Sequence, residues 1–180
     1  MRYPKIVAGA AAVALFVSLG SSASADSNRD RDKLKANLRG FEEIPTLSTP
    51  GSGEFQGKIS RDEESVEFEL RYEDLEGEVT QAHIHLGAKA FNGGIMVFLC
   101  SNLPDPPPGT QPCPVPSGTV SGSFSAADVI GPEGQGISAG EFDEAIRALR
   151  AGATYANVHT TTRPGGEIRG QIKKKDNHDD

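Results

Sequence analysis

Strict alternation of apolar and polar residues is the feature that most restricts the fold of this chain. It is clearest in SVEFELRY, residues 65–72, where Val66, Phe68, Leu70 and Tyr72 share one side and charged residues occupy the other. Successive side chains of a β-strand point to opposite faces, so this pattern predicts a strand with one buried face. A helix would instead need apolar residues three and four positions apart.

Further short strands are predicted between turns rich in Gly, Pro and Asp, in residues 33–40, 53–60, 79–86, 95–100, 118–124, 154–160 and 167–173, and their pattern is mostly the same alternation. One segment differs: residues 138–152 carry apolar residues at helical spacing, with a Ser138 and Glu141 capping box and Gly152 as the stop. The sequence predicts an all-β fold, an antiparallel Greek-key sandwich or barrel of about eight strands, with one amphipathic helix before the last two strands.

The N-terminus reads as a secretory signal peptide over residues 1–25. Arg2 and Lys5 precede an uncharged apolar run, and Ala23-Ser24-Ala25 fits a cleavage site. The run is shorter than the roughly 20 residues of a membrane span. We therefore expect a secreted or periplasmic protein with no membrane span after cleavage, although a retained anchor is the alternative. Residues 26–32 are predicted as a disordered leader, 33–173 as one domain and 174–180 as a charged tail.

The charge balance bears on possible partners. The full chain has a net charge of −7, and loss of two positive charges with the signal gives −7 − 2 = −9. A basic footprint for nucleic acid is therefore missing, and we expect no nucleic-acid partner. An extracellular protein or polymer of unknown identity remains as the expected partner.

Cys100 and Cys113 are the only cysteines. In an exported protein such a pair is predicted to form a disulfide, and closing this proline-rich loop would stabilise the fold by about 3 kcal/mol. The alternative is a redox-active pair, but the spacing is far from C-x-x-C.

Two of the four histidines lie in TQAHIHLGA, residues 80–88. Ala82 and Ile84 belong to the predicted core face, so His83 and His85 are expected on the outward face of the strand. The same argument places Asn157 and His159 outward on the next-to-last strand. On the last strand it places Glu167 and Arg169 outward. If these strands are neighbours, these residues form one polar patch at the surface.

The patch suggests a metal site. Residues two apart on a strand are about 6.6 Å apart, so the rings of His83 and His85 can converge on one ion, with His159 as a third ligand. Three imidazoles suit copper or zinc. Glu43 and Glu167 are candidates for a fourth ligand or for fixing a histidine tautomer. Affinity for a metal should then fall as the pH drops through about 6.5.

Two alternatives stay open. The histidines could be hydrogen-bonded scaffold, partnered by Asn157, Glu167 and Arg169. They could also serve a metal-dependent enzyme. The chain has no nucleophile motif and no phosphate-cradling glycine loop, which leaves no catalytic residue to name and argues against an enzyme.

Several segments resemble the CHRD (chordin-type) domain family: LRGFEEIP at 38–45, AHIHLGA at 82–88, NGG at 92–94 and YANVHTTTRPGGEIRGQI at 155–172. Thr46, Ala90, Gly94 and Ala156 depart from the family pattern, and none of these departures touches a histidine. The chain is most similar to single-domain secreted bacterial members of the family.

The resemblance implies an extracellular module. Chordin carries this domain beside cysteine-rich modules that bind growth factors, and those modules are missing here. The alternating strands with H-x-H are also similar, by analogy, to copper/zinc superoxide dismutases. We therefore expect a secreted, non-enzymatic binding or structural module with a surface histidine metal site. The alternative is a mononuclear copper- or zinc-dependent enzyme that uses the same histidines.

Overall fold

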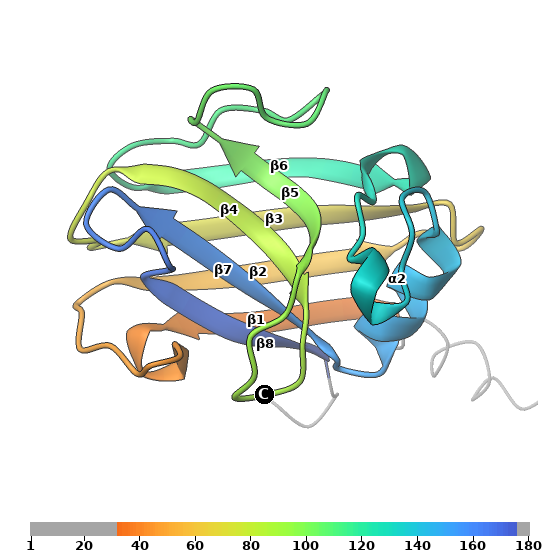
Figure 1. Cartoon of the computed structure of the whole chain (residues 1–180), viewed down its shortest axis with the longest axis horizontal. Helices are drawn as coiled ribbons and strands as arrows, with labels where there is room; N and C mark the ends of the chain where they lie inside the picture. The colour runs from red at the N-terminus through yellow and green to blue at the C-terminus, as the bar shows by residue number, and fades with distance from the viewer. Residues whose placement is uncertain (1–31, 176–180) are drawn as a thin grey trace, which may run out of the picture.

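The computed structural model describes residues 32–175. The predicted signal peptide, nearly all of the predicted leader and residues 176–180 of the predicted tail lie outside this range. The strands are β1 Lys33–Arg39, β2 Ser52–Ile59, β3 Ser65–Glu73, β4 Val79–Leu86, β5 Ile95–Ser101, β6 Gly118–Ser125, β7 Thr154–Thr160 and β8 Ile168–Lys174 (Figure 1). The α-helix is α2 Phe142–Arg150, and three single 3-10 turns are η1 Gly40–Glu42, η2 Ala126–Asp128 and η3 Glu133–Gln135.

The strands form one antiparallel sheet in the order β5-β4-β7-β8-β1-β2-β3-β6, which curls into a nearly closed barrel. The edge strands β5 and β6 meet at the seam, where Gln111 Nε2 donates to the carbonyl oxygens of Leu99 and Ser121 at 3.4 and 3.2 Å. Strand β3 lies beside β6, and β4 lies beside β7, so the chain skips over neighbours in the Greek-key manner. The predicted fold class is confirmed.

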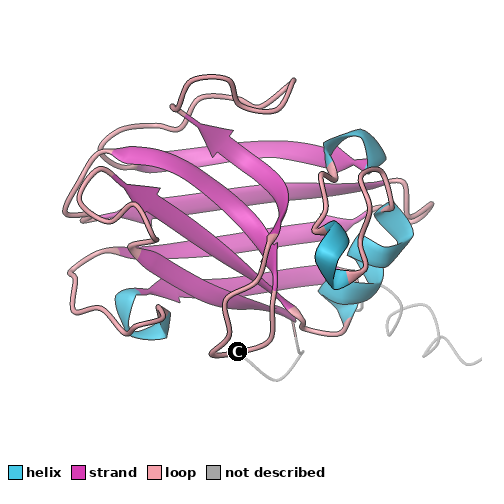
Figure 2. Ribbon diagram, viewed as in Figure 1, coloured by secondary structure: helices cyan, strands magenta, loops and turns pink. Residues whose placement is uncertain are grey.

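The alternating apolar residues fill the interior of the barrel. Phe55, Leu70, Ile84 and Ile168 are fully buried there, and their polar neighbours along each strand point away from this core. The amphipathic helix α2 packs at one end of the barrel (Figure 2), burying the apolar face that its periodicity predicted, Phe142, Ala145, Ile146 and Leu149. The predicted start is wrong, because the N-cap is Glu141 rather than Ser138. The backbone N–H of Ser138 donates to the Glu141 carboxylate at 2.6 Å, but this bond lies in the turn before the helix.

Cys100 and Cys113 are joined in a disulfide, as predicted. Cys100 lies in β5, and the bond ties the proline-rich loop to the open edge of the barrel. No free thiol is left among the described residues. Within residues 32–175 no helix is both long and apolar enough to cross a membrane.

Candidate metal centre

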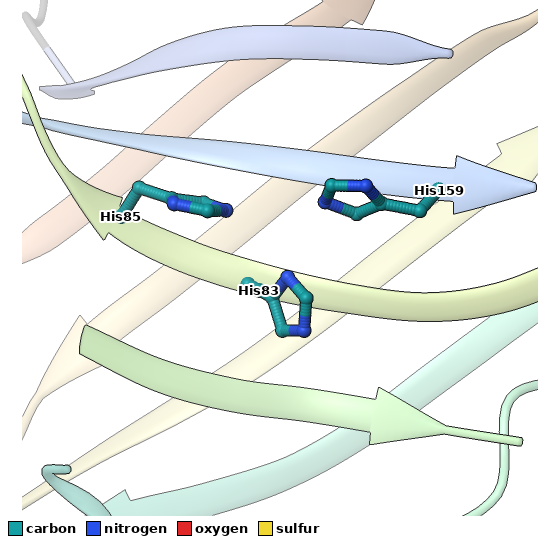
Figure 3. A group of neighbouring side chains, drawn as sticks. All are labelled: His83, His85 and His159. Carbon is teal, nitrogen blue, oxygen red and sulfur yellow. The ribbon is translucent and has the colours of Figure 1, made fainter. Parts of the chain in front are cut away.

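Strand pairing brings the three histidines of the domain together. β4 and β7 are neighbours, with Gln81 opposite His159 and His83 opposite Asn157. The ring centroids of His83 and His159 are 5.0 Å apart, and those of His83 and His85 are 5.4 Å apart. One nitrogen from each ring lies within 4.8 Å of the other two. Figure 3 shows the rings of His85 and His159 extending toward each other, with His83 beside them.

One nitrogen of each ring lies within hydrogen-bond distance of a carbonyl oxygen. His83 Nε2 lies 3.1 Å from Gln81 Oε1, His85 Nδ1 lies 3.0 Å from the Gly93 carbonyl oxygen, and His159 Nδ1 lies 2.9 Å from the Pro164 carbonyl oxygen. A carbonyl only accepts, so each of these nitrogens carries the proton. The lone pairs of the neutral rings therefore lie on His83 Nδ1, His85 Nε2 and His159 Nε2.

These same three nitrogens are buried and make no hydrogen bond. The surrounding protein also keeps the rings neutral. Burial lowers the pKa of His83 to about 2 and that of His85 to about 4, and it lowers the pKa of His159 as well. Because a metal ion needs the deprotonated nitrogen, the rings are held in the form that coordinates.

The expected surface position of the histidines is wrong. All three do point away from the barrel core, but they are buried, with exposed fractions of 0% for His83 and 7% for both His85 and His159. Neighbouring rings and loops cover this face. Phe98 from β5 packs edge-on against His83 at 4.3 Å, and Tyr155 stacks on His85 at 4.7 Å.

Arg169 holds the loop that covers one side of the group. Its guanidinium donates to the carbonyl oxygen of Phe91 at 2.7 Å and to Asn92 Oδ1 at 3.1 Å. The same group lies 3.4 Å from the centre of the Tyr155 ring, which in turn stacks on His85. Arg169 was expected at the surface, and it is instead 2% exposed because this loop folds over it.

Glu43 and Asn157 form a second buried polar pair. Asn157 Nδ2 donates to Glu43 Oε1 at 2.6 Å and to the Ile168 carbonyl oxygen at 2.9 Å. Burial raises the pKa of Glu43 to about 7, although the Asn157 hydrogen bond and the charge of Arg169 oppose this shift. Glu43 is not in the group of convergent ligand atoms, which holds only the three histidines among the described residues.

Glu167 bonds to two loops and the end of β7 rather than to the histidines. Its fully buried carboxylate accepts hydrogen bonds from Thr49 Oγ1 at 2.8 Å, from the backbone N–H of Glu76 at 2.7 Å and from Thr160 Oγ1 at 2.6 Å. It therefore joins the segments before β2 and before β4 to the last residue of β7. Like Glu43, it lies outside the group of convergent ligand atoms.

Comparison with models of known families matches residues 34–172 to the CHRD domain. The chain belongs to the CHRD family. Separate comparisons with curated proteins and with solved structures give no match. The segments by which the sequence resembled CHRD domains supply this buried centre: AHIHLGA provides His83 and His85, and YANVHTTTRPGGEIRGQI provides His159 and Arg169.

Several residues of this CHRD domain centre were not assigned a role from the sequence. They are Gln81, Gly93, Phe98, Tyr155 and Pro164. The NGG segment carried a usable signal, because Gly93 approaches the backbone so closely that an added Cβ would lie 1.6 Å from the Leu86 carbonyl oxygen. Only glycine fits there, and this close approach brings the Gly93 carbonyl to His85. Pro164 acts through its backbone, which no side-chain pattern reports.

Proposed function

We propose that this CHRD domain is a secreted, non-enzymatic binding module that holds one copper or zinc ion on His83, His85 and His159. The observation that carries the proposal is the convergence of three buried imidazole nitrogens with no hydrogen-bond partner. Leaving a buried polar atom unpaired costs about 1–3 kcal/mol, and here three such atoms share one place. A bound metal ion would partner all three at once.

The ligand types favour copper or zinc. Imidazole nitrogen is a common ligand of both ions, whereas calcium and magnesium prefer oxygen, and no carboxylate of residues 32–175 joins the group. Tetrahedral bonds of 2.0–2.1 Å place ligand nitrogens about 3.4 Å apart. Nitrogens that lie within 4.8 Å of one another would need to close by at most about 1.4 Å, which small side-chain rotations supply.

The hydrogen bonds behind the rings support the same proposal. Ligand histidines in metalloproteins generally donate their second N–H to a carbonyl or carboxylate, which fixes the ring and raises its basicity. All three histidines have such an acceptor here. If they served only as hydrogen-bonded scaffold, their remaining nitrogens would be expected to have partners as well.

Burial favours a binding module over the alternative of a metal-dependent enzyme. A catalytic metal keeps a coordination position that a substrate can reach. The convergent nitrogens are enclosed by Phe98, Tyr155 and the neighbouring loops instead. Secretion is supported by the disulfide, since such bonds persist in oxidising compartments.

The test is the metal content of the purified, tag-free protein, measured by elemental analysis before and after titration with copper and zinc. We expect near-stoichiometric uptake of one of these ions and its loss in His83→Ala and His159→Ala. His178→Ala is the matched control, because that histidine lies in the tail. Unchanged uptake in the two variants, or no uptake by the native protein, contradicts the proposal, and thermal unfolding shows whether each variant is folded.

A further inference from the structure

The lysines of the domain gather at one place. Of the seven lysines in residues 32–175, six line two hollows that share Lys35. Lys33, Lys35, Lys58 and Lys175 line one hollow, and Lys35, Lys89 and Lys173 line the other. All six are exposed or half-exposed. We refer to these six residues as the lysine patch.

The sheet register places these lysines beside one another. Lys35 lies directly opposite Lys173 in the β1–β8 pair, and Lys33 lies opposite Lys58 in the β1–β2 pair. The backbone N–H of Lys175 donates to the carbonyl oxygen of Lys33, which brings a third lysine into that row. Neighbouring strands are about 4.8 Å apart and alternate residues about 6.7 Å apart, so the ammonium groups form a compact array.

Such an array concentrates positive charge on one surface of an acidic chain. Six of the seven lysines in residues 32–175 lie on two adjacent strand pairs or in the loop that carries Lys89. Carboxylates accompany some of them, since Lys89 pairs with Glu42 and Lys58 lies opposite Glu67. A bound polyanion would contact several of the ammonium groups at once, because they share one face of the domain.

The surroundings of the lysine patch select among polyanions. Glu54, Glu67 and Glu69 line its β2–β3 side, and Glu42, ion-paired with Lys89, lies on the other side. A flat anionic membrane would be repelled by these flanking carboxylates, whereas a narrow polymer chain that follows the β1–β8 strand pair avoids them.

The polar residues between the lysines point to a sugar polymer. The exposed amides of Asn37 and Gln56 stand in the same rows and suit hydroxyl groups. No exposed aromatic ring in the two hollows offers a stacking platform for nucleic-acid bases.

We propose that the lysine patch binds a linear anionic polysaccharide, one carrying sulfate or phosphate groups, along the β1–β8 strand pair. This surface shares no side chain with the histidine centre, although Lys89 lies in the loop that covers it, and binding would not depend on a metal. Binding should be strongly salt-dependent, because ammonium groups that contact a polyanion release its counterions.

The experiment measures binding of metal-depleted, full-length protein to immobilised dextran sulfate between 50 and 200 mM NaCl. The test variant is Lys35→Gln with Lys173→Gln. The control is Arg71→Gln with Arg147→Gln, which changes the net charge equally outside the lysine patch. We expect the test variant to bind at least about tenfold more weakly, with a salt slope reduced by about 1 to 2, and the control to stay within about twofold of the native protein.

Three outcomes overturn the proposal: equal loss in both variants, equal binding to uncharged dextran, or binding to anionic phospholipid vesicles without binding to dextran sulfate. Thermal unfolding of both variants establishes that they are folded. A Lys89→Gln variant provides a second measurement in the second hollow of the lysine patch. We expect a smaller loss of affinity there, because Glu42 already pairs with that lysine.

Discussion

Acid should destabilise the metal-free protein through its buried histidines. Above pH 6.5 the three rings are neutral in both the native and the unfolded chain, so their contribution to stability is constant. Below pH 6.5 the histidines of the unfolded chain bind protons, whereas those of the native chain stay neutral. The free energy of unfolding therefore falls as the pH drops. The loss continues until the pH passes through the native pKa values, about 4 for His85 and about 2 for His83.

Glu43 acts in the opposite direction. Its native pKa is about 7 against an ordinary value of 4.5, so between these values the native protein keeps a proton that the unfolded chain releases. Its contribution to stability therefore falls as the pH rises. Each proton that one state binds and the other does not changes the free energy of unfolding by about 1.4 kcal/mol per pH unit. Two or three histidines minus Glu43 leave a net loss of about 1.4–2.7 kcal/mol per unit between about pH 6 and 4.5.

Over that interval the loss is about 2–4 kcal/mol, a large share of the 5–15 kcal/mol that stabilises an ordinary domain. The assay is urea unfolding of chelator-treated protein at pH 7, 6, 5.5, 5 and 4.5 at constant ionic strength. His83→Gln should lower the slope by about 1.4 kcal/mol per unit if it folds. Stability that stays flat or rises on acidification would refute the reasoning, as would an unchanged slope in the variant.

Two further predictions concern the cross-links of the fold. Replacing both cysteines, Cys100→Ser with Cys113→Ser, should lower the free energy of unfolding by about 3 kcal/mol, measured with urea; a change under about 1 kcal/mol would mean that the proline-rich loop is already ordered without the bond. Glu167→Ala should cost about 3–5 kcal/mol, because Thr49, Thr160 and the Glu76 N–H lose their acceptor. Glu69→Ala, on an exposed strand face, should change stability by less than about 0.5 kcal/mol, and equal effects of the two changes would contradict this role.

Alternation in the sequence located seven of the eight strands, because each has one face in the core, and β5 was located as a short, wholly apolar run between turns. It also placed His83, His85 and His159 correctly on the opposite face. Burial of that face could not be predicted in the same way. It depends on where the loops fold, and loops such as residues 87–94 carry no periodicity that reports what they cover.

The roles of the carboxylates show the same limit. Glu167 was expected near the histidines because it shares an outward face with Arg169, yet its hydrogen bonds go to Thr49 and Glu76, far away in the sequence. The pH range expected for metal binding also changes. Exposed histidines would lose a metal near pH 6.5, whereas burial lowers their pKa values and moves proton competition to more acidic conditions.

The carbonyl oxygens behind His85 and His159 belong to the backbone of Gly93 and Pro164. Every amino acid carries that oxygen, so changing a loop side chain cannot delete the acceptor as long as the loop keeps its path. Relatives could therefore diverge freely at most positions of these loops and still present the same imidazole nitrogens. His83 is the exception, since its acceptor is the side chain of Gln81, and drift at that single position would alter the centre directly.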